Sequence, residues 1–254
     1  MRGIVPRIIF PPTDPRLSAP FFLQPHVFLC QAKRHWVILD VNRDKYFCVD
    51  RQQFEALGDS LEGWEDSSVV LKECPVALSG DAAALANDLL RQDVLTERAA
   101  GAKHARATTY PLPTEAVDPE LSSRRSPVAH AVAFFASCAR AARELSKQRF
   151  QSTVDLVRAR KGRHAHGTRP FDFERARSLA SVFERLRLFY PRSYLCMFDS
   201  LALIHFLARF DLYPDWVFGV NADPFEAHCW VQAGRVVLND TVQRVSSFTP
   251  IMYV

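Results

Sequence analysis

Residues 195–212 read LCMFDSLALIHFLARFDL and are almost wholly apolar. This segment is long enough for a helix of several turns, and its apolar side chains point in every direction, so we expect it to be central to its domain. Strand-like segments follow at residues 216–221, 227–233 and 236–242, and a tail ends the chain. The sequence therefore predicts an α+β domain built around this one helix.

Further helices precede this segment. Residues 128–145 are rich in Ala and Leu and have one apolar face, residues 149–160 continue the helical pattern, and residues 171–190 form a strongly amphipathic stretch that Pro191 ends. We therefore place one domain at residues 127–254. Residues 99–126 contain three prolines and many small or polar residues with little periodicity, which indicates a linker.

The front of the chain has a different organisation. Residues 26–49 alternate as three short strands do, with a hairpin turn at NRDK, and helices are predicted at residues 52–57 and 81–95. This pattern predicts a second compact α+β module at residues 21–98. Residues 1–20, with several prolines, are predicted to be a loose tail rather than a secretory signal.

Composition excludes several classes of protein. The chain has 254 residues, of which 48% are apolar and 24% charged, as in ordinary soluble domains. Its apolar runs fall short of the ~20 residues that a membrane span requires. The six cysteines include no C-x-x-C pair, so neither a zinc site nor a disulfide framework is expected. We expect a cytoplasmic protein with reduced thiols, no metal and no cofactor.

Charge is unevenly distributed although the net charge is only +4. Between Leu121 and Arg192 there are 16 Arg and Lys against 5 Asp and Glu. Solvated helix faces explain such an excess, and so does docking of an acidic partner. Nucleic-acid binding is disfavoured because the front, through Glu115, has 13 basic against 15 acidic residues.

Three residues suggest cysteine-nucleophile chemistry. Cys196 lies at the predicted start of the apolar helix, where unpaired amides and the helix dipole favour a thiolate. His228 and Asp240 lie on the two strand-like segments that follow, as a base and its orienting carboxylate would. Each residue alone is weak evidence, since a packed thiol, a structural histidine and a turn aspartate are all common. Their order along the chain is a much rarer combination.

Strand pairing gives a geometric test of this triad. If Ala233, Gly234 and Arg235 form a three-residue loop, His228 lies directly opposite Asp240. A two-residue loop would place His228 opposite Thr241 and turn Asp240 away. The triad therefore requires the longer loop. By strand alternation Cys229 points to the face opposite His228, which excludes it as a competing nucleophile.

The segments RSYLCMFDSLALIHFL, VFGVNADPFEAHCWVQ and GRVVLND resemble the lasso-peptide leader peptidases, the B proteins of microcin J25-type pathways. The resemblance covers about 60 residues and rests on Arg192, Cys196, Ser200, Leu201, Ala202, Gly219, Val220, Pro224, Phe225, Ala227, His228, Trp230, Val231 and Asp240. It implies a transglutaminase-like, papain-related peptidase domain with Cys196, His228 and Asp240 as catalytic residues.

The front of the chain resembles, more weakly, the PqqD-like RiPP recognition element of such proteins, a winged-helix-like module of three strands and three helices. This resemblance implies that the leader of a ribosomal precursor peptide adds beside the third strand, residues 45–49, and packs on the helix at residues 81–92. Its expected contacts are Tyr46, Cys48, Leu85 and Leu89, although simple packing explains these residues equally well.

The resemblance implies hydrolysis between leader and core, after which an ATP-dependent lasso macrolactam synthetase closes the core. No ATP site is recognisable in this chain. Two alternatives remain open. The same triad could transfer an acyl group to an amine, as transglutaminases do, or the front module could escort a leader peptide without any peptidase activity.

Overall fold

The computed structural model describes residues 20–64, 79–118, 128–164 and 170–254. The predicted N-terminal tail up to residue 19 and the part of the predicted linker from residue 119 lie outside the described residues. The chain forms two compact units. The smaller unit comprises the chain up to Pro25 together with residues 52–106, and the larger unit comprises residues 26–51 and 107–254.

The smaller unit combines short elements around an apolar core. Its elements are the antiparallel strands β1 (Phe22–Leu23) and β5 (Leu95–Thr96), with α1 (Arg51–Glu55) at its border, η2 (Gly58–Ser60) and α2 (Ser79–Arg91). Phe54 is fully buried and packs edge-on against Trp64, with 5.3 Å between the ring centroids. Leu89 of α2 is buried in the same unit, whereas Leu85 is half-buried.

The three predicted front strands are confirmed, and they belong to the larger unit. They are β2 (Val27–Ala32), β3 (His35–Asp40) and β4 (Lys45–Asp50), paired antiparallel in the order β2-β3-β4. The buried carboxylate of Asp40 fixes the predicted turn by accepting hydrogen bonds from the Arg43 backbone N–H at 3.0 Å and its guanidinium at 2.8 Å. Asp44 completes the turn with a φ of 52°, a left-handed conformation that Asp tolerates.

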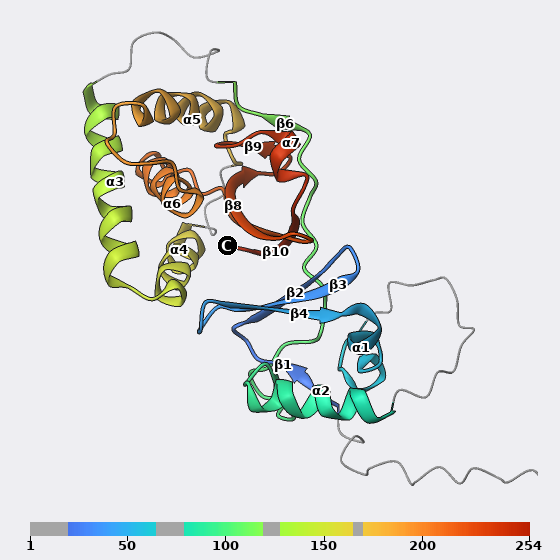
Figure 1. Ribbon diagram of the computed structural model, residues 1–254. Helices are drawn as coiled ribbons and strands as arrows, with labels where there is room; N and C mark the ends of the chain where they lie inside the picture. The colour runs from blue at the N-terminus through green and yellow to red at the C-terminus, as the bar shows by residue number, and fades with distance from the viewer. Residues whose placement is uncertain (1–19, 65–78, 119–127, 165–169) are drawn as a thin grey trace, which may run out of the picture. The chain divides into compact units, whose positions relative to one another are not determined.

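A five-stranded sheet forms the second layer of the larger unit (Figure 1). In spatial order its strands are β10 (Thr249–Tyr253), β7 (Asp215–Ala222), β8 (Phe225–Ala233), β9 (Val236–Val237) and β6 (Glu115–Ala116). Two of them differ from expectation. β6 lies within the predicted linker and β10 within the predicted tail, because a two-residue strand and a strand containing Pro250 give no clear alternating pattern.

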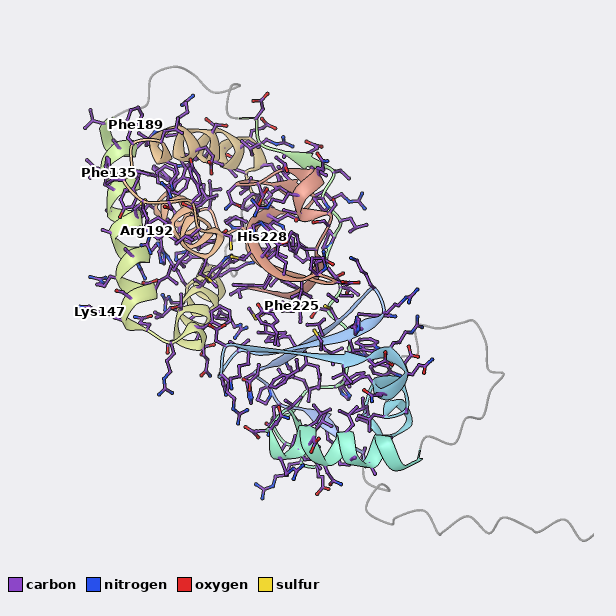
Figure 2. The ribbon with its side chains drawn as sticks, in the orientation of Figure 1. Phe135, Lys147, Phe189, Arg192, Phe225 and His228 are labelled. Carbon is purple, nitrogen blue, oxygen red and sulfur yellow. The ribbon has the colours of Figure 1, made fainter. Side chains whose placement is uncertain are left out.

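Helices pack on this sheet. They are α3 (Val128–Lys147), α4 (Phe150–His164), α5 (Phe173–Arg187), α6 (Cys196–Leu207), the turn η4 (Ala208–Phe210) and the short α7 (Val242–Val245). α6 lies between α3 and strand β8 (Figure 1), and every residue from Phe198 to Leu207 is buried. The prediction of a central apolar helix is confirmed. On α3, Phe135 and Lys147 point outward (Figure 2).

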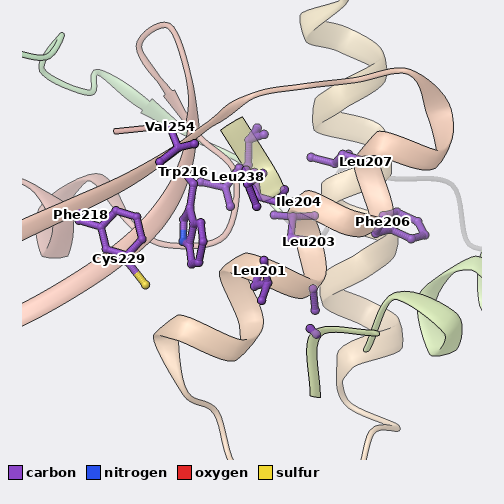
Figure 3. Packing of buried hydrophobic residues seen from close by; sticks show 14 of the residues in the cluster. Leu201, Leu203, Ile204, Phe206, Leu207, Trp216, Phe218, Cys229, Leu238 and Val254 are labelled. Atoms are coloured by element: carbon purple, nitrogen blue, oxygen red, sulfur yellow. The ribbon is translucent and has the colours of Figure 1, made fainter. Parts of the chain in front are cut away.

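One continuous apolar core joins the two sheets of the larger unit. Leu201 of α6 and Trp216 and Phe218 of β7 belong to one buried cluster (Figure 3). Val37 and Leu39 of the three-stranded sheet belong to the same buried cluster. Burial of this much apolar surface is the main stabilising contribution to the fold, and it places the three-stranded sheet against the domain that carries Cys196.

Candidate active site

Cys196 is the first residue of α6. Leu195 precedes the helix in an extended conformation with φ −136°, and no side chain caps the helix at this residue. The Asp199 carboxylate accepts a hydrogen bond from the Leu195 backbone N–H at 2.7 Å. The half-buried thiol of Cys196 therefore lies at a helix N-terminus, where the dipole stabilises an anion.

A buried arginine holds the loop that leads into Cys196. Arg187, at the end of α5, is 1% exposed and pairs with Asp199. Its guanidinium also donates to the backbone carbonyls of Arg192 at 2.9 Å and Ser193 at 3.0 Å, and it lies 4.3 Å from the ring centroid of Tyr194. This role is not apparent from the sequence, in which Arg187 is one of many basic residues on an amphipathic helix.

His228 and Cys229 occupy the middle of β8, opposite Gly219 and Phe218 of β7. The His228 ring packs near Trp230, at 5.9 Å between centroids, and near Phe248, at 5.0 Å. A Cβ at Gly219 would lie 2.9 Å from the Trp230 ring. Glycine is therefore needed at residue 219 so that the rings that support His228 can approach the backbone.

Asp240 lies against His228, with 2.6 Å between its Oδ2 and Nε2 of the imidazole. The three-residue loop predicted for this contact is wrong. Gly234 and Arg235 alone form the turn, Gly234 has a φ of 58°, and Ala233 pairs with Val236. The contact nevertheless forms because backbone pairing with β8 ends after the Leu238 N–H donates to the Val231 carbonyl at 2.9 Å, so strand register does not govern the position of Asp240.

The Asn239 side chain takes the place of a backbone acceptor where the pairing with β8 ends. Its Oδ1 accepts a hydrogen bond from the Val231 backbone N–H at 2.7 Å, and its Nδ2 donates to the Ser200 hydroxyl at 3.0 Å. Ser200 in turn donates to the Cys229 carbonyl at 3.2 Å. This network connects α6, β8 and the residue before Asp240. Ser200 was among the motif residues and Asn239 lies in the segment GRVVLND, but nothing in the sequence predicted their pairing.

The Cys229 side chain lies closer to Cys196 than expected. As strand alternation predicts, Cys229 points away from the face of His228 and toward α6 (Figure 3). The face toward α6, however, is the one on which Cys196 lies, and the two thiols share a hydrogen bond. Cys229 is 2% exposed, and burial, followed by the hydrogen bond to Cys196 and its charge, holds the pKa of Cys229 well above its ordinary value.

The electrostatics favour an ion pair between Cys196 and His228. Hydrogen bonds from Cys229 and then from His228 lower the pKa of Cys196 to about 4, against the opposing effect of burial. Burial alone would lower the pKa of His228, but hydrogen bonds with Asp240 and Cys196 raise it to about 9. Burial would raise the pKa of Asp240, yet hydrogen bonds from His228 and the Thr241 N–H lower it. Thiolate and imidazolium therefore coexist near neutral pH.

The residues predicted to contact a leader lie in both units. Tyr46 is half-buried on β4, and its ring centroid lies 5.5 Å from that of Phe225, three residues before His228. Cys48 is exposed on the same strand face. Leu85 and Leu89 belong to the smaller unit, where Leu89 is only 3% exposed. Lys33 donates to the Asp223 carbonyl at 2.6 Å, a second link between the three-stranded sheet and the β7–β8 hairpin.

Comparison with protein families agrees with this architecture. Residues 135–253 match the transglutaminase-like superfamily, represented by the family Transglut_core3. The C-terminal part of the chain is thus a transglutaminase-like domain in a mixed α/β protein, and it contains Cys196, His228 and Asp240. Such domains are typically cysteine-protease-like enzymes, which fits a Cys-His-Asp site of peptidase or acyltransferase type. No curated protein and no solved structure gives a significant match.

Two other features, a membrane span and a metal site, are absent from the part of the chain that the structure describes. It contains no helix with the length and apolar character needed to cross a lipid bilayer. Within the same residues, no group of three or more His, Cys, Asp or Glu side chains is arranged to hold a metal ion.

Proposed function

We propose that this protein is a cysteine peptidase in which Cys196 is the nucleophile, His228 the acid and base, and Asp240 the residue that orients His228. The observation that carries the proposal is the hydrogen-bonded series Cys196–His228–Asp240 at the start of a buried helix. Nucleophile, base and orienting carboxylate are the three parts that covalent acyl-transfer catalysis requires.

Each residue has a defined step. The Cys196 thiolate attacks the carbonyl carbon of the scissile peptide, and the Cys196 backbone N–H is a donor for the resulting oxyanion. The imidazolium of His228 then gives its proton to the leaving amine, which leaves an acyl-enzyme. His228 next takes a proton from water, which attacks the thioester and releases Cys196. Asp240 keeps the Nε2 proton of His228 directed away from the sulfur throughout.

We further propose that the substrate is the leader–core junction of a ribosomal lasso-peptide precursor. This rests on the resemblance of residues 192–240 to lasso-peptide leader peptidases. Within the described residues β4 pairs only with β3, so one edge of the three-stranded sheet is available to an added peptide strand. Tyr46 and Cys48 lie on that edge strand, and Tyr46 contacts the hairpin that carries His228.

Processing of the precursor tests the proposal. The purified protein is incubated with the peptide encoded by a short reading frame beside its gene, and the masses of the products are measured by mass spectrometry. Wild-type protein should release leader and core by hydrolysis at one bond. Cys196→Ala should abolish cleavage while leader binding persists, and Asp240→Asn should slow it. Equal cleavage by Cys196→Ala would reject the proposed nucleophile and leave an escort role for the protein.

Acyl transfer is the second candidate, because the transglutaminase-like match fits it as well as hydrolysis. Adding an amine such as glycine amide to the reaction separates the two. A peptidase forms mainly the free leader acid over a range of amine concentrations. A transferase forms the leader amide in proportion to the amine, and does so faster than hydrolysis.

A further inference from the structure

Two cysteines meet where the candidate nucleophile lies. Cys196 and Cys229 come from different elements, α6 and β8, and their side chains share a hydrogen bond. The Cys229 backbone N–H also hydrogen-bonds to the Cys196 sulfur. In peptide hydrolysis, as proposed, Cys229 lowers the pKa of Cys196 but makes and breaks no bond.

The surrounding contacts fix this arrangement. The Ser200 hydroxyl donates to the Cys229 carbonyl at 3.2 Å, and Asn239 holds that hydroxyl from its other side at 3.0 Å. Ser200 lies four residues after Cys196, so the two share one face of α6. The first turn of the helix is thereby held along β8, with Cys196 beside Cys229.

The two sulfurs differ in accessibility. Cys196 is half-buried and can be reached by a small oxidant, whereas Cys229 is 2% exposed and shielded from solvent. An accessible thiolate next to a second cysteine is the arrangement typical of reversible thiol oxidation, in which the second cysteine resolves a sulfenic acid.

We propose that Cys196 and Cys229 form an oxidative modification site, at which hydrogen peroxide converts the pair to a reversible disulfide. The Cys196 thiolate attacks one peroxide oxygen, the O–O bond breaks, and hydroxide leaves as water after taking a proton. Cys229 then attacks the Cys196 sulfenic acid, the S–O bond breaks, and the departing hydroxide takes the Cys229 proton. The two thiols lose two electrons together, and one peroxide becomes two waters.

Oxidation of Cys196 makes the following attack by Cys229 easier. Burial, the hydrogen bond to Cys196 and the charge of Cys196 keep the pKa of Cys229 high, and hence Cys229 protonated, while Cys196 is a thiolate. Oxidation to a neutral sulfenic acid removes that negative charge, so Cys229 loses its proton more readily. The pair therefore stays reduced until the nucleophile is oxidised, and the disulfide then protects it from further oxidation.

Disulfide mapping tests the proposal without any peptide substrate, so its outcome is independent of the proposed peptidase function. The full chain with Cys48→Ser and Cys74→Ser is treated with hydrogen peroxide, blocked with iodoacetamide under denaturing conditions and digested without reduction. We expect a cross-linked peptide containing Cys196 and Cys229, and loss of Cys196 alkylation in the native protein that dithiothreitol restores. Cys196 sulfinic acid together with unoxidised Cys229 would overturn the proposal.

A variant comparison measures protection. Cys229→Ala should lose Cys196 alkylation irreversibly, because the sulfenic acid has no resolving thiol and proceeds to sulfinic acid. The matched control is Cys138→Ala, which removes another fully buried cysteine, on α3, and should recover with dithiothreitol as the parent does. Equal recovery of the two variants would also overturn the proposal. If Cys229→Ala does not fold, the disulfide mapping of the protein that retains Cys229 is the deciding test.

Discussion

Arg187 and Asp199 form a buried ion pair beside the first turn of α6. Asp199 binds the Leu195 N–H, and Arg187 binds the carbonyls of Arg192 and Ser193. This ion pair thus binds both backbone carbonyls and a backbone N–H of the loop that precedes Cys196. Such pairs contribute little against an apolar replacement, but removing one partner leaves an uncompensated buried charge.

Arg187→Gln should therefore destabilise the protein strongly. Breaking a buried ion pair costs about 3–5 kcal/mol, which urea unfolding followed by circular dichroism measures. Alkylation of Cys196 at pH 6 should slow as well, because the loop before the helix loses its anchors.

The matched control is Arg177→Gln on the same helix. Arg177 is partly exposed and pairs with the exposed Glu115, and exposed pairs contribute about 0–1 kcal/mol. Equal destabilisation by the two substitutions would contradict the role assigned to Arg187.

The ion pair between Cys196 and His228 predicts an unusual pH profile. The pKa of Cys196 is lowered to about 4, so its thiolate persists above that pH and is lost as the pH falls through it. The pKa of His228 is raised to about 9, so its proton is lost as the pH rises through that value. Peptidase activity should therefore be bell-shaped between these limits.

Alkylation measures the acid limb directly. Cys196 should react with iodoacetamide at pH 6, whereas exposed Cys48, whose pKa burial raises above its ordinary value, should hardly react. At pH 6 an ordinary thiol is less than roughly a hundredth thiolate. His228→Ala should return the Cys196 profile toward that of Cys48. A Cys196 midpoint unchanged by this substitution would show that His228 does not stabilise the thiolate.

Asn239 is expected to position Asp240. Asn239→Ala removes hydrogen bonds to Val231 and Ser200, leaving buried partners unsatisfied at a cost of about 1–3 kcal/mol. Because Asp240 is the next residue, its contact with His228 should loosen and the alkylation midpoint of Cys196 should rise. Asn221→Ala is the control, since Asn221 makes a single exposed hydrogen bond to the Asp223 N–H at 3.3 Å. A midpoint that stays fixed in both variants would refute the positioning role.

Only part of the candidate site could be predicted from the sequence. Cys196, His228 and Asp240 were identifiable from their order and motif, and the apolar helix was identifiable from its composition. The predicted three-residue loop was wrong because it assumed that strand register sets the position of Asp240, whereas the chain leaves the pairing with β8 after Leu238, where the Asn239 side chain accepts from the Val231 N–H. The role of Arg187 could not be predicted from the sequence, because its burial depends on how residues 190–195 fold around it. The approach of Tyr46 to Phe225 joins residues far apart in the chain and has no local signal.

Phe225 is expected to contribute to substrate binding rather than to chemistry. It is 48% exposed, lies on the strand that carries His228 (Figure 2), and contacts Tyr46 of β4. Phe225→Ala should raise KM for the precursor peptide about fivefold, since an aromatic contact contributes about 1 kcal/mol, while kcat and the alkylation rate of Cys196 stay the same.

Phe135→Ala on α3 is the control of matched exposure, at 45%, and should leave KM unchanged. If Phe225→Ala instead lowers kcat or Cys196 alkylation, the ring supports the nucleophile and not the substrate. If the precursor is not cleaved at all, unchanged alkylation still shows that the Phe225 ring leaves the thiolate undisturbed. The KM for the precursor peptide therefore tests the substrate contact, and the alkylation rate of Cys196 tests the thiolate independently of peptidase activity.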